Sequence, residues 1–168
     1  MASVREADQI PSPGPRHEVM RLSAHETAHF TILSRTWWKV WTHWDDYRAR
    51  TIPCDQDQAN CRGCQNHLPL RFKAYLHVIH HEARKAVFLE LTPNAAKQLE
   101  GQAPPNEPFR GLEISLARGH GPKAGLRLTV NQYHPRETNL PPEQDPKPIL
   151  TALWEMPDRR RRFRGEVA

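Results

Sequence analysis

The sequence lacks a long apolar run, and this absence limits where the protein can reside. Its 168 residues contain no stretch of about 18 consecutive apolar residues, the length that a membrane-spanning helix needs. The first segment, MASVREADQIPSPGPRHE, has no apolar core like that of a secretion signal, so we expect no signal peptide. We therefore expect a cytoplasmic protein that has no membrane partner.

Recognisable catalytic motifs are also missing. The chain has no paired acidic constellation, no nucleophile elbow and no glycine-rich phosphate loop. The zinc-deaminase pattern His-x-Glu…Pro-Cys-x-x-Cys is absent as well, since Asn60 precedes the CxxC pair and Trp44-Asp45 follows His43. We expect a protein that is not an enzyme.

Cysteine is absent except in one short cluster. Cys54, Cys61 and Cys64 lie within eleven residues. Three cysteines cannot pair completely, and in a chain without an export signal such a cluster indicates metal binding rather than disulfides. Cys61-x2-Cys64 has the spacing with which two thiolates bind one ion. We predict one structural zinc ion held by these cysteines and one further ligand.

Two histidines are candidates for that fourth ligand. His43 lies at the expected end of a strand and could reach across the loop to the cysteines. His67 follows Cys64 so closely that the chain would have to curl back sharply. We favour His43 and keep His67 as the alternative.

What the chain does have is positive charge and proline. Lys and Arg number 24 against 19 Asp and Glu, a formal net charge of +5, which favours a polyanionic partner. Proline-rich segments near both ends are typical of extended arms. We predict a flexible N-terminal arm (1–18), a folded domain (19–134), and a proline-rich linker with an apolar patch (149–156) and a basic tail (135–168 in all).

Alternating apolar and polar residues predict a mainly β domain. A helix over 93–99 should begin at Thr92 as its N-cap and end at Gly101. In the first strand we expect Trp38 and Val40 to point inward and Trp37 and Trp41 outward. The reversed assignment and a helical segment are the alternatives. The five expected strands are 28–43, 70–79, 85–91, 110–118 and 126–133.

The order of these elements matches the oligonucleotide-binding (OB) fold. We therefore predict a five-stranded OB-type Greek-key barrel with a short helix between strands 3 and 4. Its zinc-binding loop, 45–69, would lie between strands 1 and 2, next to the face with which this fold binds its ligands.

Aromatic and basic residues interleave in two of the expected strands. Four of the five tryptophans lie within residues 37–44. Single-strand binders combine such aromatic platforms with a basic groove. The residues predicted to contact nucleic acid are Trp37, Lys39, Trp41, Trp44, Tyr47, Arg48, Arg50, Arg71, Lys73, Tyr75, Arg110, Arg118, Lys123 and Arg127.

The segment THWDDYRARTIPC…CRGC resembles the zinc-containing OB fold of the T-even phage single-stranded-DNA-binding protein family. The resemblance rests on the order of ligands and strands over about residues 28–133. It implies that His43, Cys54, Cys61 and Cys64 hold zinc beside a DNA cleft. Two features depart from the family: the interval between Cys54 and Cys61 is short, and the chain ends in RRRRFR where the family has an acidic tail.

These observations lead to two functional hypotheses. The first is a non-enzymatic protein that binds single-stranded nucleic acid, DNA in preference to RNA, in replication, recombination or a mobile-element process. The alternative is a protein–protein adaptor, a subunit of a larger nucleoprotein complex that docks through residues 149–164.

Overall fold

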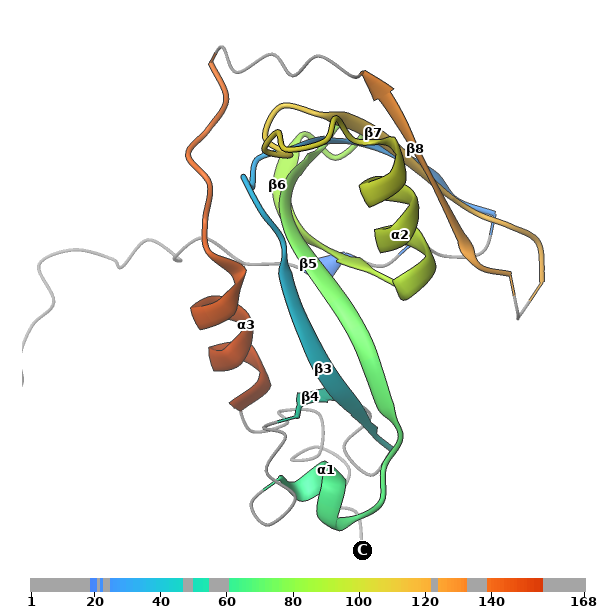
Figure 1. Ribbon diagram of the computed structural model, residues 1–168, viewed down its shortest axis with the longest axis vertical. Coiled ribbons are helices and arrows are strands. Elements are labelled where there is room, and N and C mark those ends of the chain that lie inside the picture. Colours follow the sequence, from blue (N-terminus) through green and yellow to red (C-terminus); the bar gives the residue numbers. More distant parts are fainter. Residues whose placement is uncertain are drawn as a thin grey trace, which may run out of the picture.

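The structure, a computed structural model, describes residues 19–20, 22, 25–46, 50–54, 61–121, 124–132 and 139–155 (Figure 1). Within these residues eight strands form one mixed sheet, which confirms that the protein is mainly β. No helix in this part of the chain has the length and apolar character that crossing a membrane requires. The strands are β1 (Val19–Met20), β2 (Thr27–Ile32), β3 (Trp38–Asp45), β4 (Arg50–Pro53), β5 (Leu70–His80), β6 (Lys85–Leu91), β7 (Glu113–Arg118) and β8 (Leu126–Gln132). The helices are α1 (Arg62–Gln65), α2 (Pro93–Gln102) and α3 (Pro146–Glu155).

The sheet is organised around β5, its longest strand. β6 pairs with one edge of β5, from Ala74↔Leu91 to His80↔Lys85. On the other edge, β2 pairs with the second half of β5 and β3 pairs with the first half. The free end of the β3–β5 pair extends away from the rest of the sheet, and there β4 pairs with β3 (Figure 1). We call these three paired strands, β4–β3–β5, the ribbon.

The first expected strand is therefore two strands. The chain turns where the backbone amides of Leu33 and Ser34 both donate to the carbonyl oxygen of His77, at 2.8 and 3.2 Å. The Ser34 hydroxyl in turn accepts from the amide of His77 at 2.7 Å. This local exchange replaces regular pairing, so β2, which lies between β5 and β7, ends here and β3 begins farther along β5.

The two longer helices cover opposite faces of β5 (Figure 1). The larger core joins Ala95, Ala96 and Leu99 of α2 to the alternate apolar residues of β2, β5, β6, β7 and β8. A smaller cluster packs Leu150 of α3 on Tyr75 and Phe88. The alternate residues Phe72, Ala74, Leu76 and Val78 of β5 lie on the α2 face, in agreement with the alternation of this strand.

Helix α3 comes from the segment for which we expected a linker and a docking patch. Leu150 is fully buried against the sheet of its own chain. Arg110 fixes the approach to α3, since its guanidinium donates to the carbonyl oxygens of Leu33, Leu140 and Pro141 at 2.8–3.2 Å. Residues 139–152 thus form part of the folded unit. The predicted arm (1–18) and the basic tail lie outside the described residues.

Helix α2 begins as the sequence predicts. The Thr92 hydroxyl accepts from the amide of Ala95, and a proline occupies the first turn. The helix runs one residue past Gly101, to Gln102. The expected loop over 45–69 instead contains β4 and the short α1.

The sheet does not close into a barrel in the described part of the chain, which corrects the expected five-stranded barrel. The reason lies at the outer edge of β8. Gln98 accepts from the amide of Leu128 at 2.6 Å, while Gln102 accepts from Val130 and donates to the carbonyl of Leu128. The two glutamines, one helical turn apart on α2, take up hydrogen-bonding groups that a closing strand would need.

Candidate metal centre

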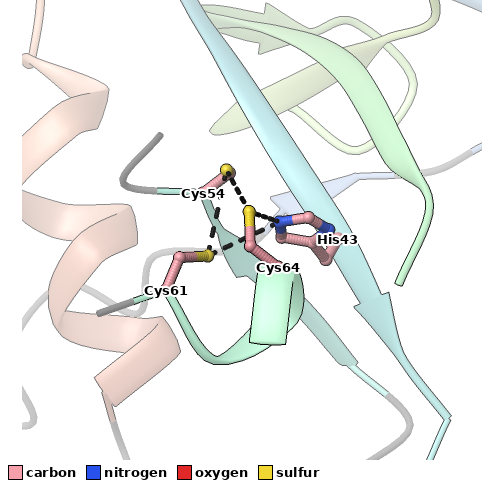
Figure 2. A group of neighbouring side chains, drawn as sticks. All are labelled: His43, Cys54, Cys61 and Cys64. Carbon is pink, nitrogen blue, oxygen red and sulfur yellow. Dashed lines mark hydrogen bonds between the residues drawn. The ribbon is translucent and has the colours of Figure 1, made fainter. Parts of the chain in front are cut away.

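Four side chains from three elements converge at the tip of the ribbon (Figure 2). His43 comes from β3, Cys54 directly follows β4, and Cys61 and Cys64 lie at the start and within α1. One ligand atom from each lies within 4.8 Å of all the others. The cysteines form no disulfide. The structure therefore confirms a group able to hold a metal ion and brings His43, rather than the exposed His67, to the cysteines.

The separations of these atoms fit tetrahedral coordination. Cys54 Sγ lies 3.6 Å from Cys64 Sγ and 3.8 Å from Cys61 Sγ. His43 Nε2 lies 3.5 Å from Cys61 Sγ and 3.6 Å from Cys64 Sγ. With zinc bonds of about 2.3 Å to sulfur and 2.0–2.1 Å to nitrogen, a tetrahedron has S···S edges of about 3.8 Å and S···N edges of about 3.5 Å. Four of the six donor–donor distances thus already match those that one such ion requires, and the other two are within 4.8 Å.

A hydrogen bond from the other ring nitrogen of His43 prepares the imidazole for coordination. Its Nδ1 lies 2.9 Å from the carbonyl oxygen of Leu68. A carbonyl oxygen only accepts, so Nδ1 must carry the proton and Nε2 presents its lone pair to the cysteines. The amide of Leu68 donates to the carbonyl of Gly63, which ties this support back to α1. His43 is 1% exposed, so its ring has a fixed orientation.

Gly63, between the two cysteines of the CxxC pair, allows this close approach. A Cβ atom at Gly63 would lie 2.2 Å from Cδ2 of His43. The CRGC segment forms a helical turn, in which the Gln65 amide donates to the carbonyl of Cys61, and such a turn does not itself require glycine. The residue at 63 is instead limited by the imidazole beside it.

The Cys64 thiol differs from free cysteine in its acidity. Burial raises the pKa of Cys64 to about 12, with further contributions from the neighbouring thiols of Cys54 and Cys61. Thiolates this close together repel one another, and a bound divalent cation removes that repulsion. The raised pKa of Cys64 is unlike that of a reactive cysteine nucleophile, and the four side chains together form a group able to hold a metal ion.

The ribbon connects this centre to a cleft on the α2 face. The cleft has a volume of about 680 Å³ and lies between α2 and the strands β3 and β5. Trp41, two residues before His43, is 44% exposed, and Leu70, which pairs with His43, is 55% exposed. They are the exposed large apolar side chains among the described residues. The lining residues are Trp37, Lys39, Trp41, Leu70, Arg71, Phe72, Lys73, Pro93, Ala96, Lys97 and Glu100.

Ring contacts hold the aromatic side chains of the cleft in place. Trp41 packs edge-on against Phe72 with ring centroids 5.9 Å apart. Trp37 packs edge-on against Phe109 at 4.9 Å, and the ammonium of Lys39 lies 5.9 Å from the Trp37 ring. The cleft thus combines oriented aromatic rings with the positive charges of Lys39 and Lys97.

The other predicted contacts have different surroundings. Tyr75 is buried and its hydroxyl donates to Glu90, which also pairs with Lys73 at 2.7 Å, so Tyr75 offers no open ring. Arg110 is engaged with three carbonyl groups. Trp44 is half-buried at the end of β3, and Arg118 and Arg127, on β7 and β8, do not line the cleft.

Some predicted residues are not described. Tyr47, Arg48 and Lys123 lie outside the described residues, and of Arg50 only the backbone is described. The sequence interpretation also missed the α2 wall of the cleft. Positions 93, 96, 97 and 100 share one helical face, a pattern visible in the sequence, but the strand that it faces depends on tertiary packing.

The chain matches no protein-family model, no curated protein and no solved structure.

Proposed function

We propose that this chain is a zinc-containing, non-enzymatic protein that binds single-stranded nucleic acid, DNA in preference to RNA, in the cleft beside the metal centre. The observation that carries the proposal is the exposed Trp41 ring, which lies on β3 between Lys39 and the candidate metal ligand His43 and lines the cleft together with Lys97. The proposed setting is a cytoplasmic process of replication, recombination or mobile-element transfer, as the resemblance in ligand order to the zinc-containing phage family implies.

Zinc is the proposed metal because of the donor set. Three thiolates and one imidazole suit zinc, and four protein ligands close its tetrahedral shell. Such a closed site leaves no position for substrate, which supports a structural role. The ion would supply the stability that the ribbon lacks, because the ribbon tip lies beyond the main apolar core.

Single-stranded nucleic acid is the proposed ligand because the cleft offers what unpaired bases need. An exposed indole stacks on a base and contributes roughly 1–3 kcal/mol for each base stacked. Lys39 and Lys97 can neutralise the adjoining phosphates. Bases in a duplex are stacked on each other and cannot enter. An OB barrel binds its ligand on the face formed by its own second and third strands. In this protein the proposed binding site is instead the cleft on the open sheet.

The test is a titration of labelled single-stranded DNA, single-stranded RNA and duplex DNA at low salt, followed by fluorescence anisotropy. We expect single strands to bind with a steep salt dependence and duplex to bind more weakly. Trp41→Ala should weaken binding by roughly fivefold or more, while Trp41→Phe retains most of it. Lys97→Ala should lower the salt slope by about 1, and Arg127→Ala is the control that removes one charge outside the cleft.

Two results would contradict the proposal: no binding of any single strand at low salt, or equal affinity of Trp41→Ala and wild type. A preference for RNA over DNA would keep the site and change the ligand. The adaptor alternative has less support, because Leu150 of its proposed docking segment is buried within the same chain.

A further inference from the structure

The α2 wall of the cleft carries one acidic residue beside one basic residue. Pro93, Ala96, Lys97 and Glu100 lie on one face of α2 and line the cleft opposite Trp41 and Phe72. Among the described residues, none forms an ion pair or a hydrogen bond with the carboxylate of Glu100. Its carboxylate is therefore free to meet a ligand in the cleft.

We propose that Glu100 selects the base, so that the cleft favours unpaired bases with an exocyclic amino group, cytosine and adenine above all, over thymine and uracil. This inference rests on the proposed function and names the ligand class of the same site. An ionised carboxylate only accepts hydrogen bonds. Cytosine N4 and adenine N6 donate, whereas thymine and uracil present O4, an acceptor, at the same place.

The size of the cleft favours the binding of a single nucleotide over the binding of a long stretch of nucleic acid. Its volume of about 680 Å³ falls within the range of about 300–1,000 Å³ that is usual for sites of small ligands. A base stacked on Trp41 would occupy the apolar part, formed by Phe72, Leu70 and Ala96. Its edge would then meet α2, where Glu100 is the acceptor and Lys97 lies one turn away for a phosphate.

The charges of the lining favour a nucleotide over an apolar peptide. Lys39 and Lys97 attract an anion, and the oriented rings of Trp37 and Trp41 suit a planar group. A nucleotide combines the two. The basic C-terminal segment RRRRFR has the wrong charge to occupy the cleft itself.

The experiment compares labelled homopolymers of about eight nucleotides, dC, dA and dT, binding to zinc-loaded full-length protein at pH 7. The decisive pair is dC against dT, because the two pyrimidines have similar rings and stack similarly. We expect dC to bind at least about fivefold more tightly than dT. Glu100→Gln, which can both accept and donate, should bind dC and dT alike. Glu107→Gln is the matched control, since it removes the same charge from an exposed residue that does not line the cleft.

The outcomes separate the two proposals. Loss of the dC preference in Glu100→Gln and its retention in Glu107→Gln support the assignment. Equal binding of dC and dT by wild type, with Trp41→Ala still defective, overturns the base selection and leaves the proposed function intact. A dC preference that survives Glu100→Gln overturns the role of Glu100. Failure of every oligonucleotide to bind overturns both proposals.

Discussion

The backbone amide of Cys54 donates a hydrogen bond of 2.9 Å to the carbonyl oxygen of Trp41. One partner is a ligand of the candidate metal centre, and the other is the exposed ring of the cleft. Two residues further along the same strand, His43 provides another ligand. The metal centre and the cleft are therefore neighbouring parts of one ribbon, and the geometry of Trp41 depends on how firmly the ribbon tip is held.

Metal removal should destabilise the fold. Chelation, or the double substitution Cys61→Ser and Cys64→Ser, should lower the melting temperature, because a structural zinc site contributes directly to the free energy of folding. Metal analysis of the wild type should give one zinc per chain. An unchanged melting curve for the double variant would contradict a structural role.

Substitution of Gly63 should disrupt metal binding without removing a ligand. The Cβ of Gly63→Ala would lie 2.2 Å from the imidazole of His43, so either α1 or the ring must move. We expect less zinc per chain and a lower melting temperature. Gly101→Ala is the matched control, since a Cβ there meets nothing within 4 Å and alanine favours a helix. Full zinc occupancy in Gly63→Ala would contradict the described contact.

The edge of β8 should pair with other chains when the two glutamine side chains that bind it are removed. Gln98→Ala with Gln102→Ala leaves the backbone groups of Leu128 and Val130 without their partners on α2. Exposed strand edges pair with other chains. We expect concentration-dependent association in sedimentation velocity, and Asn94→Ala, on an exposed position of α2, should show none. A monomeric double variant would refute this role of the glutamines.

A surface ion pair should contribute stability in a defined pH range. Partial burial alone would raise the pKa of Glu82, but hydrogen bonds from the His29 side chain and from the backbone amides of Glu82 and His29 lower it to about 2. Because the folded-state pKa is lowered from 4.5, the contribution is present above about pH 4.5 and is lost as the pH falls toward 2.

Glu82→Gln should therefore be less stable than wild type at pH 5–6, with the difference vanishing near pH 2. The two side chains are 51% and 46% exposed, so we expect less than about 1 kcal/mol in urea unfolding. Glu107→Gln should show no such pH-dependent difference. A constant gap between wild type and Glu82→Gln from pH 6 to pH 2 would rule out the pair.

The comparison of sequence and structure shows which signals are local. The Cys61-x2-Cys64 spacing, the Thr92 cap and the alternation along β5 depend on neighbouring residues. The spacing indicated a group able to hold a metal ion, and the other two signals predicted the start of α2 and a strand. The prediction of a barrel was wrong because Gln98 and Gln102 bind the edge of β8 that a closing strand would need. This contact joins residues about 30 positions apart, so local sequence patterns do not show it. The burial of Tyr75 likewise depends on α3, which sequence composition presented as a linker.

The cleft likewise combines features that the local sequence indicates with features that depend on tertiary packing. Trp37, Trp41 and the lysines Lys39 and Lys73 were identified from the sequence, and strand alternation put both tryptophans on one face of β3. That face is the α2 face, where Trp41 is exposed but Trp37 packs against the larger core, which corrects its predicted outward position. Its second wall required the packing of α2 against the ribbon, which no periodicity reveals. The role of Gly63 was also hidden, since it is set by His43, twenty residues earlier.

The most direct test of the account is the affinity for a labelled single-stranded oligonucleotide before and after the metal is removed, at a temperature where the metal-free chain still has its β circular dichroism. If the metal centre holds Trp41 in place, removal should weaken binding by at least about fivefold, within the usual range of coupling between sites, and one equivalent of zinc should restore it. Equal affinity with and without zinc would contradict the account, because the metal centre and the cleft would then be independent.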